Sequence, residues 1–507
     1  MASQQLTVDG GKNADWWDWF HVLVTNARHL EMAARKIAVI GAGAAGLCAA
    51  KHLIATGQAV VVFEMGTRIG GLWVYENDNG LSGAYQSLHV NSENRVTAYQ
   101  DFPFPESAPI YPDHLQMAQY LEAYAEHFSL RPHIRFRSKV AAVGLLAGGA
   151  WKVRLDDGTS ERFDAVVVAT GHQGVPSHPP FAKDFTGQYL HSHAYRVPEP
   201  FKGKHVLVVG AGNSACDIAS DICTVTASAT MAARSPVLLM PRMFLGVPTS
   251  RVLGKIEKPW MPWPLRRWFR EAITRMAHGR MEQWSFVTPK TRTHPAGHHL
   301  LIGHFIWNRI SARPGIEKIS GDTVHFTDGS SKRFDAMIAA TGYEVHLPFL
   351  SEALSPMRGR WLELFHQVVR PGVPGLYFVG FFNVSGGGNI RMMDDQAQWV
   401  AAIETGKAGL PSPQAMLQAI QKDRDTVTRL YPDSPRYALE LDPRAYRAAL
   451  AGEMRRIAGQ TVNPVVSGRC RTLGDPPPAP ARKQTRSPRP TESCSRRASR
   501  SHRPLRR

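Results

Sequence analysis

The sequence predicts an α/β protein with two dinucleotide-binding domains, one of them inserted in the other. Two repeated features lead to this fold class. A short apolar strand, a glycine-rich loop and a helix occur twice, as "KIAVIGAGAAGLCAA" from Lys36 and "HVLVVGAGNSACDIA" from His205. A hairpin pattern that ends in Ala-Thr-Gly also occurs twice, as "VRLDDGTSERFDAVVVATG" and "VHFTDGSSKRFDAMIAATG". Internal repeats of this kind indicate two copies of one structural unit.

The first glycine loop lies where a strand meets a helix. Gly41, Gly43 and Gly46 follow the strand Ile37–Ile40, and apolar residues then continue at helical spacing. Glycines here allow a tight turn and close approach of the backbone to a pyrophosphate, which the helix N-terminus attracts. Glu64 ends the next strand, eighteen residues after Gly46, where a carboxylate can hydrogen-bond a ribose diol. The alternative is a glycine-rich turn beside a surface carboxylate.

The second glycine loop differs from the first at the end of the strand that follows it. Gly210, Gly212 and Ser214 form the loop, and Arg234 and Ser235 stand where the first copy has its acid. A guanidinium at this place favours a 2′-phosphate, which a carboxylate would repel. We therefore expect NADPH at the second loop, unless Arg234 is only a solvated charge at the end of a strand.

The first loop is expected to bind FAD. Its acid would hold the ribose, and the sequence Gly70-Gly71-Leu72-Trp73 shortly after it suits the same nucleotide. Gly71 and Trp73 are therefore further candidates for FAD contacts. The two loops together predict a flavoprotein that NADPH reduces.

The order of the repeats predicts how the domains are nested. We expect residues 34–178 and 317–455 to form one FAD-binding domain, interrupted by an NADPH-binding domain at 179–316. The two Ala-Thr-Gly segments would lie at the two crossings between them. Asp157-Gly158 and Asp328-Gly329 predict a tight hairpin turn in each copy.

The positive charge of the chain is concentrated at its C-terminal end. The net charge is +18, yet the segment from Arg469 to Arg507 holds twelve basic residues and only two acidic ones. Residues 460–507 are rich in Pro, Arg and Ser, which predicts a disordered tail. A tether to nucleic acid or a membrane surface is the alternative for this tail, and we expect no nucleic acid at the core. Residues 1–33 precede the first strand as an extension without an assigned role.

Cysteine usage and hydropathy favour the cytoplasm. The five cysteines are scattered and form no Cys-x-x-Cys pair, which suits a reducing compartment and disfavours a thiol–disulfide reductase. No run approaches eighteen apolar residues, and the N-terminus lacks a secretory pattern. We therefore expect no transmembrane segment.

One stretch places the chain within a family. "FTGQYLHSHAYR", residues 185–196, lies directly before the second glycine loop and resembles the identifying sequence of the flavin-containing monooxygenases. "GGLW", "YQSLHVNSENRVTAYQDFPFP" and "AATGY" are also similar to segments of that family, and the resemblance covers roughly residues 34–455. The related Baeyer–Villiger enzymes carry Trp where this chain has Tyr195. We interpret the stretch as a linker that seats the two nucleotide domains against each other, with His191 as a structural residue.

The resemblance implies both an architecture and a reaction. The architecture is the nested, glutathione-reductase-like one, and a homodimer is compatible with it. NADPH would reduce FAD, dioxygen would form a C4a-(hydro)peroxyflavin, and this species would oxygenate nitrogen or sulfur of a small organic substrate, as in N,N-dimethylaniline monooxygenase activity. The cofactor carries this chemistry, and the protein orients the reactants and excludes water. The alternatives are Baeyer–Villiger oxygenation of ketones and an NADPH oxidase that releases hydrogen peroxide.

The resemblance also implies site residues. Asn91 matches the family's active-site asparagine beside the flavin, with an ordinary turn residue as the alternative. Thr170 and Thr341, in the Ala-Thr-Gly segments, would border the flavin and nicotinamide, or else only end their strands. A helix that starts at Asp394-Asp395-Gln396 would bring Gln396 to the flavin ring, or use it as a simple cap.

Two further segments are open to more than one interpretation. His294, His298 and His299 could suggest a metal site, but no nearby cysteine or carboxylate completes a ligand set, so we expect no metal. The basic and aromatic segment 258–280 could touch a membrane surface. A packed lid or a dimer contact is the interpretation we favour for it.

Overall fold

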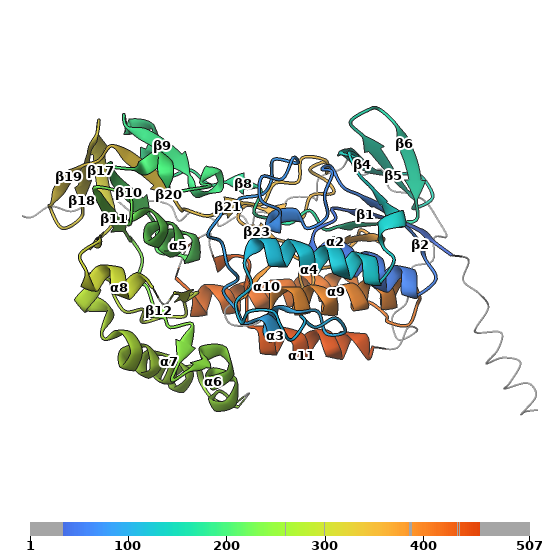
Figure 1. The fold of residues 1–507 in the computed structure, drawn as a ribbon. Coiled ribbons are helices and arrows are strands. Elements are labelled where there is room, and N and C mark those ends of the chain that lie inside the picture. The colour runs from blue at the N-terminus through green and yellow to red at the C-terminus, as the bar shows by residue number, and fades with distance from the viewer. Residues whose placement is uncertain are drawn as a thin grey trace, which may run out of the picture. The chain divides into compact units, whose positions relative to one another are not determined.

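The structure is a computed structural model that describes residues 34–456, except 259, 299, 385–387, 433 and 435–436. The predicted extension 1–33 and the predicted tail 460–507 lie outside the described residues. Two parallel sheets with their covering helices account for most of the described chain (Figure 1).

The first sheet has five parallel strands in the order β24-β7-β1-β2-β3. They are β1 (Lys36–Ile40), β2 (Ala59–Phe63), β3 (Ile134–Arg135), β7 (Ala165–Val168) and β24 (Leu376–Phe378). The glycine loop after β1 leads into α2 (Ala44–Ala55), as predicted. Apart from Lys36 and Arg135 at strand ends, the strands are apolar, because both faces of a parallel sheet are covered.

Neighbouring residues of β1 enter different cores. Ile37 and Val39 pack with α2 and with α9 (Asn389–Glu404) on one face of the sheet. Ala38 and Ile40 pack on the other face against the antiparallel strands β4 (Val140–Leu145), β5 (Trp151–Leu155) and β6 (Ser160–Phe163). This alternation follows from the two-residue period of a strand.

The second sheet repeats the first. Its order is β16-β11-β10-β20-β9, and all its pairs are parallel. The strands are β9 (Gln188–His191), β10 (His205–Val209), β11 (Ser228–Ala232), β16 (Ile310–Arg313) and β20 (Ala336–Ala339), and α5 (Asn213–Ile222) follows the second glycine loop. A second antiparallel sheet, β17 (Ile316–Ser320), β18 (Thr323–Phe326) and β19 (Ser331–Arg333), shares a core with β10. Both predicted hairpins are confirmed.

The expected domain boundary between residues 316 and 317 is wrong. Strand β20 pairs with β10 and β9 in the second sheet, and the sheet of β17, β18 and β19 packs on that same sheet. Each hairpin therefore belongs to the glycine loop that precedes it in the chain. The return to the first sheet comes only after β20, and β24 is the later strand that joins it.

The two Ala-Thr-Gly segments do lie at the two crossings between the sheets. After them the chain forms β8 (Val175–Pro176) and β21 (Tyr343–Glu344), which pair antiparallel. Thr341 Oγ1 donates to the Ser177 carbonyl at 2.6 Å, and the Ser177 N–H donates to the Gly342 carbonyl at 3.0 Å. The outgoing and returning segments are thus bonded to each other.

The other elements surround these sheets. The helices are α3 (Asn94–Thr97), α4 (His114–His127), α6 (Thr249–Ile256), α7 (Trp263–His278), α8 (Leu301–Ile306), α10 (Pro413–Leu430) and α11 (Pro443–Met454). The short strands are β12 (Leu239–Met240), β13 (Met243–Phe244), β14 (Val247–Pro248), β15 (Ala296–Gly297), β22 (Met357–Arg358), β23 (Trp361–Leu362), β25 (Asn383–Val384) and β26 (Glu440–Leu441). None of the helices within the described ranges has the length and apolar character needed to cross a membrane.

The stretch 185–196 is more than a linker, because it contributes the edge strand β9. It also contacts the segment between β2 and β3 of the first sheet. The Arg196 guanidinium donates to the Ser82 carbonyl, and the Gln86 N–H donates to the Arg196 carbonyl. Tyr195 is buried and donates to Asp221 Oδ2 at 2.6 Å. The expected seating role is therefore combined with a place in the second sheet.

His191 gives the fold a predicted pH dependence. Burial, with the neighbouring His178 and His193, lowers the pKa of His191 to about 4, whereas an unfolded histidine has a pKa of about 6.5. Between these values the unfolded chain binds a proton that the folded protein excludes, so the free energy of unfolding falls as the pH falls. We expect His191 to lower the free energy of unfolding by about 2 kcal/mol at pH 5 relative to pH 7.5.

The change His191→Asn tests this, since the Asn oxygen can replace Nδ1 as acceptor for the His193 N–H. Urea unfolding at pH 5 and pH 7.5 should show a smaller pH dependence in the variant. His127→Asn, at the exposed end of α4, is the control and should behave as wild type. Equal pH dependence in wild type and His191→Asn would contradict the expectation.

Candidate functional site

A cavity of about 2190 Å³ opens at the carboxyl ends of both parallel sheets. Both glycine loops line it, together with Glu64, Asn91 and Arg234. A pocket for one small ligand usually measures roughly 300–1,000 Å³, so this cavity has room for more than one ligand. The carboxyl edge is also where open α/β sheets bind nucleotides.

The first loop has no space for a side chain at Gly41 or Gly46. A Cβ on Gly41, whose φ is +105°, would lie 2.7 Å from the Ala169 carbonyl oxygen. A Cβ on Gly46 would lie 1.8 Å from the Gly41 carbonyl oxygen. Gly43 faces Gly71, with 3.6 Å between its ideal Cβ and the Gly71 Cα. The loop is therefore a bare backbone cradle at the start of α2, and it fits a pyrophosphate.

Glu64 stands beside this cradle. It is buried, lines the cavity, and accepts from the Ala42 N–H at 2.8 Å and the Gly66 N–H at 2.9 Å. Its Oε1 also accepts from Asn79 Nδ2 at 3.3 Å, so Oε2 is the carboxylate oxygen that can accept a further bond. Trp73 is half-buried, lines the cavity and packs against the core of the first sheet. The chemistry of this wall suits a nucleotide with a free ribose diol.

The second loop repeats the arrangement. Gly210 has a φ of +125°, and a Cβ there would lie 2.5 Å from the Ala340 carbonyl oxygen. Gly212 and Ser214 line the cavity at the start of α5. Arg234 is exposed and lines the cavity, and within the described ranges no hydrogen bond or ion pair engages its guanidinium. This charge is thus available to an anionic ligand.

Asn91 lines the cavity beside the second sheet's segments. Its Oδ1 accepts from Arg242 Nη2 at 3.0 Å, and its carbonyl oxygen lies 3.8 Å from the ideal Cβ of Gly297. Arg242 also meets Asp217 of α5, with Nη2 and Oδ1 3.4 Å apart. Asn91 is itself exposed, and its side-chain oxygen is bonded to a buried arginine.

The threonines of the two Ala-Thr-Gly segments line the cavity, but their hydroxyls bond to backbone. Thr170 Oγ1 lies 3.5 Å from the Gly171 carbonyl, and Thr341 Oγ1 bonds to Ser177 as described above. Both residues thus have the strand-ending role that was the alternative, in addition to their place at the cavity.

Gln396 does not occupy the expected position. The helix α9 begins at Asn389 rather than at Asp394, so Gln396 lies two turns into it. Its side chain is fully buried, accepts from the Gly380 N–H at 2.9 Å and donates to the Tyr446 hydroxyl at 2.7 Å. The residues of α9 that line the cavity are Asn389, Ile390 and Met393. Gln396 is a structural residue between α9 and α11.

The histidines of segment 294–299 do not converge. His294 Nδ1 lies 3.1 Å from Glu440 Oε1, and His298 Nε2 lies 3.2 Å from Asp217 Oδ1, while His299 is outside the described residues. In the part of the chain that the structure describes, no three His, Cys, Asp or Glu side chains group as a metal site would require.

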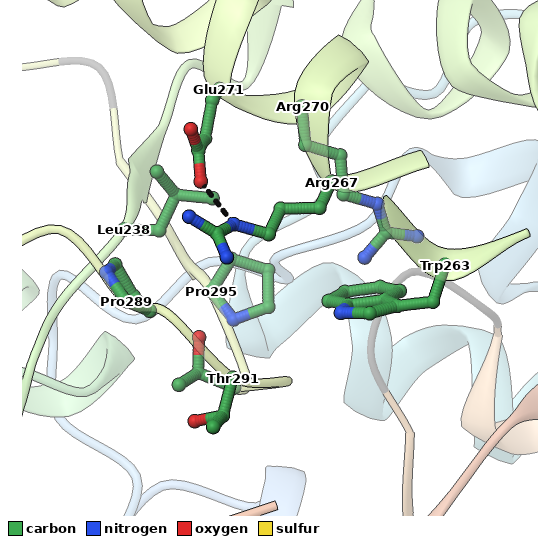
Figure 2. A pocket seen from close by; sticks show the side chains of 9 residues that line it. Leu238, Trp263, Arg267, Arg270, Glu271, Pro289, Thr291 and Pro295 are labelled. Atoms are coloured by element: carbon green, nitrogen blue, oxygen red, sulfur yellow. Dashed lines mark hydrogen bonds and ion pairs between the residues drawn. The ribbon is translucent and has the colours of Figure 1, made fainter. Parts of the chain in front are cut away.

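Two arginines of the basic helix α7 form ion pairs within the protein. Figure 2 shows Arg267 directed at Glu271, a pair 2.5 Å apart, around a small pocket of about 20 Å³. Arg270 pairs with Glu257 of the segment after α6 at 2.6 Å. Trp263 borders both this small pocket and the large cavity. These two arginines are thus paired within the protein, and the packed lid or dimer contact that we favour for this segment stays a prediction.

Sequence reasoning missed Arg242 and Asp217. Arg242 lies in "LLMPRMF", which matches no motif used above, and it is 151 positions from Asn91. Asp217 lies on α5 one turn after the glycine loop, where an acid is an ordinary helix residue. Arg242 and Asp217 both belong to the second half of the chain, and only the approach of the two halves brings them to Asn91.

Comparison with known proteins identifies the family. The family model described as flavin-binding monooxygenase-like matches residues 34–455. The chain belongs to this family, and it is accordingly a flavoprotein monooxygenase, an oxidoreductase.

Individual relatives agree with this assignment. Flavin-containing monooxygenase 3 of Macaca mulatta is 30% identical over 422 residues, 78% of this chain and 79% of the relative. Flavin-containing monooxygenase 1 of Homo sapiens is 30% identical over 421 residues, 77% of this chain and 78% of the relative.

Solved structures share the fold. The S-allyl-L-cysteine S-oxygenase of Allium sativum matches with a TM-score of 0.64 and 25% identity, over 85% of this chain and 90% of that one. Cyclohexanone monooxygenase from Rhodococcus sp. Phi1 bound to NADP⁺ matches with a TM-score of 0.61 over 83% of this chain and 97% of that one. At 17% identity the second similarity concerns the fold alone.

The first loop can be tested with Gly46→Ala. The added methyl group cannot coexist with the Gly41 carbonyl at 1.8 Å, so the loop must move. We expect a loss of about 3 kcal/mol in the free energy of unfolding and little flavin in the purified protein. Gly452→Ala in α11, where a Cβ meets nothing within 4 Å, is the matched control. Flavin content and stability equal to the control would show that this glycine is dispensable.

Proposed function

We propose that the chain is an FAD- and NADPH-dependent monooxygenase that oxygenates nitrogen or sulfur of a small organic substrate. The observation that carries the proposal is that two glycine cradles and Asn91 open on one cavity. An acid beside one cradle and an arginine beside the other support two different nucleotides there. In this proposal the nested arrangement has an FAD-binding domain interrupted by an NADPH-binding domain.

The residues around the two glycine loops hold the two nucleotides in this proposal. Gly41, Gly43, Gly46 and Gly71 hold the FAD pyrophosphate against backbone, and Glu64 binds its ribose. Gly210, Gly212, Ser214 and Arg234 hold NADPH, the arginine through the 2′-phosphate. FAD, when bound, supplies the transfer of electrons from NADPH to dioxygen.

Asn91 is the catalytic residue of the proposal. Its amide NH₂ group can donate to the oxygen that is being activated or to the nicotinamide amide. A donor placed in advance, in a cavity from which water is excluded, stabilises negative charge as it develops. Thr170 and Thr341, which line the cavity, would border the flavin and the nicotinamide.

The function is tested by comparing the NADPH consumed with the oxygenated product and the hydrogen peroxide formed. The holoenzyme, with and without residues 460–507, would be given NADPH, air and one tertiary amine, one sulfide or one ketone. We expect NADPH consumption to match N- or S-oxide formation, with little hydrogen peroxide. Lactone or ester formation from the ketone would favour the Baeyer–Villiger alternative, and complete recovery of electrons as peroxide would favour an oxidase. A core that neither binds FAD nor consumes NADPH would remove the basis of the proposal.

Arg234→Ala tests the second nucleotide site. Loss of a charge-assisted hydrogen bond to the 2′-phosphate should raise the KM for NADPH about ten-fold or more and leave the KM for NADH nearly unchanged. Arg162→Ala, an exposed strand arginine outside the cavity, is the control. An unchanged preference between the two cofactors would exclude Arg234 from the site.

Asn91→Ala and Asn91→Asp test the proposed donor. Both variants should retain FAD and be reduced by NADPH without air at rates near wild type. In air they should release hydrogen peroxide in place of oxygenated product, because the donor is gone. Asn94→Ala is the neighbouring control, since the Asn94 amide donates to the Pro109 carbonyl away from the cavity. Oxygenation by Asn91→Ala that is as well coupled as in wild type would argue against the role.

A further inference from the structure

The orientation of the Asn91 amide is fixed by its partner. Arg242 Nη2 lies 3.0 Å from Asn91 Oδ1. A guanidinium has five N–H donors and no acceptor, so the amide must turn its oxygen toward Arg242. The NH₂ group of Asn91 then points away from Arg242, and within the described chain no hydrogen bond engages it. Since Asn91 lines the cavity, this orientation offers a donor to whatever the cavity holds.

Arg242 is itself held from several directions. Its Nε donates to the Gly297 carbonyl at 3.0 Å, and its guanidinium carbon lies 5.7 Å from the centre of the Tyr111 ring. The Tyr111 hydroxyl donates to the Arg242 carbonyl at 2.6 Å. The Arg242 side chain is only 8% exposed. A side chain restrained in this way loses little further freedom when it orients a neighbour.

Asp217 provides the counter-charge for this buried arginine. Its Oδ1 lies 3.4 Å from Arg242 Nη2 and 3.2 Å from His298 Nε2. Its Oδ2 accepts from the Tyr85 hydroxyl at 2.8 Å. His298 Nδ1 accepts from the Leu301 N–H, so its Nε2 carries the proton that faces Asp217. Three donors thus surround the Asp217 carboxylate. Their hydrogen bonds replace those that water would give to the buried Arg242–Asp217 pair.

The same helix anchors the other side of the arrangement. The Asn213 Oδ1 at the start of α5 accepts from the Gly297 N–H at 3.0 Å. Gly297 therefore receives one bond from the arginine and gives one to α5. The guanidinium sits between Asn91, which belongs to the first half of the chain, and the helix that carries the second glycine loop.

We infer that Arg242 is a positioning residue that holds the Asn91 amide with its NH₂ group toward the cavity. This inference rests on the proposed function, since it gives the catalytic donor its direction. Without Arg242 the amide can rotate and present its oxygen, an acceptor, where a donor is needed. The expected consequence is that dioxygen is reduced to hydrogen peroxide and substrate is not oxygenated. Nucleotide binding and flavin reduction should stay intact.

A double-mutant cycle in the full-length holoenzyme tests the inference. The variants are Arg242→Met, Arg242→Lys, Asn91→Ala and the double variant Asn91→Ala with Arg242→Met. Arg251→Lys is the control, because Arg251 forms an ion pair with Glu93 near the same loop but does not line the cavity. The readouts are FAD content, the rate of anaerobic flavin reduction by NADPH, and hydrogen peroxide released per NADPH in air.

Arg242→Met should keep FAD content and a reduction rate within about three-fold of wild type, and should release peroxide at least about ten-fold faster. Adding Arg242→Met to Asn91→Ala should change peroxide release less than two-fold, since Arg242 acts through Asn91. Peroxide release at the wild-type level in Arg242→Met, or a further ten-fold rise in the double variant, would overturn the inference. The control should match wild type.

Arg242→Lys provides the test if Arg242→Met does not fold. An ammonium keeps the charge beside Asp217 but lacks the planar fork that spans Gly297 and Asn91 at once. We expect an intermediate rise in peroxide release, about three-fold, and no rise would overturn the inference.

A neutron or atomic-resolution crystal structure of Arg242→Met or Arg242→Lys, in which amide oxygen and nitrogen can be told apart, supplies a readout that does not depend on activity. The Asn91 side chain should leave its single orientation in the variant and keep it in Arg251→Lys. An unchanged Asn91 orientation would overturn the inference whatever the peroxide measurements give. Failure of the proposed function is seen separately, as a wild-type enzyme that NADPH does not reduce.

Discussion

Two backbone segments pass each other closely at the edge of each parallel sheet, and this contact determines where the nucleotide cradles and the cavity form. Gly41 meets the Ala169 carbonyl and Gly210 meets the Ala340 carbonyl at distances that no side chain permits, 2.7 Å and 2.5 Å from an ideal Cβ. Each glycine loop is thereby fixed against the Ala-Thr-Gly segment of its own sheet. Because those segments are also where the chain leaves and re-enters the first sheet, the nucleotide cradles and the crossings share one edge, and the cavity forms there.

The polar network around Arg242 has a different physical basis. A buried ion pair contributes little net stability, because desolvation of two charges offsets their attraction. Its effect here is on the relative orientation of the two halves of the chain. The buried charges are tolerated only when hydrogen-bond donors and acceptors from both halves are paired. Tyr85 and Asn91 come from the first half, while Asp217 and Arg242 come from the second. The network therefore favours one alignment of the cavity's two walls over others that would leave a buried group unpaired.

The features that the sequence predicts correctly are those that a short segment specifies by itself. The strand, glycine loop and helix of each copy follow from local pattern, as do the Asp157-Gly158 and Asp328-Gly329 hairpins. The errors concern longer-range pairing. The boundary at 316 failed because spacing does not say which sheet β20 joins, and Gln396 failed because α9 begins at Asn389, well before the acidic pair taken as its start. The contact between Arg242 and Asn91 had no local signal at all, since 151 positions separate them.

The same contrast explains why charge is a poor guide to this site. Arg251 of α6 and Arg267 and Arg270 of α7 are paired within the fold, so the number of arginines says little about what the protein binds. Arg234 is informative because it is exposed at the cavity with no internal partner in the described structure, and Arg242 is informative because its partner is an amide as well as a carboxylate. A carboxylate partner would accept the guanidinium in any protein. An amide partner must direct its oxygen toward the guanidinium, and its NH₂ group then remains able to donate to a ligand in the cavity.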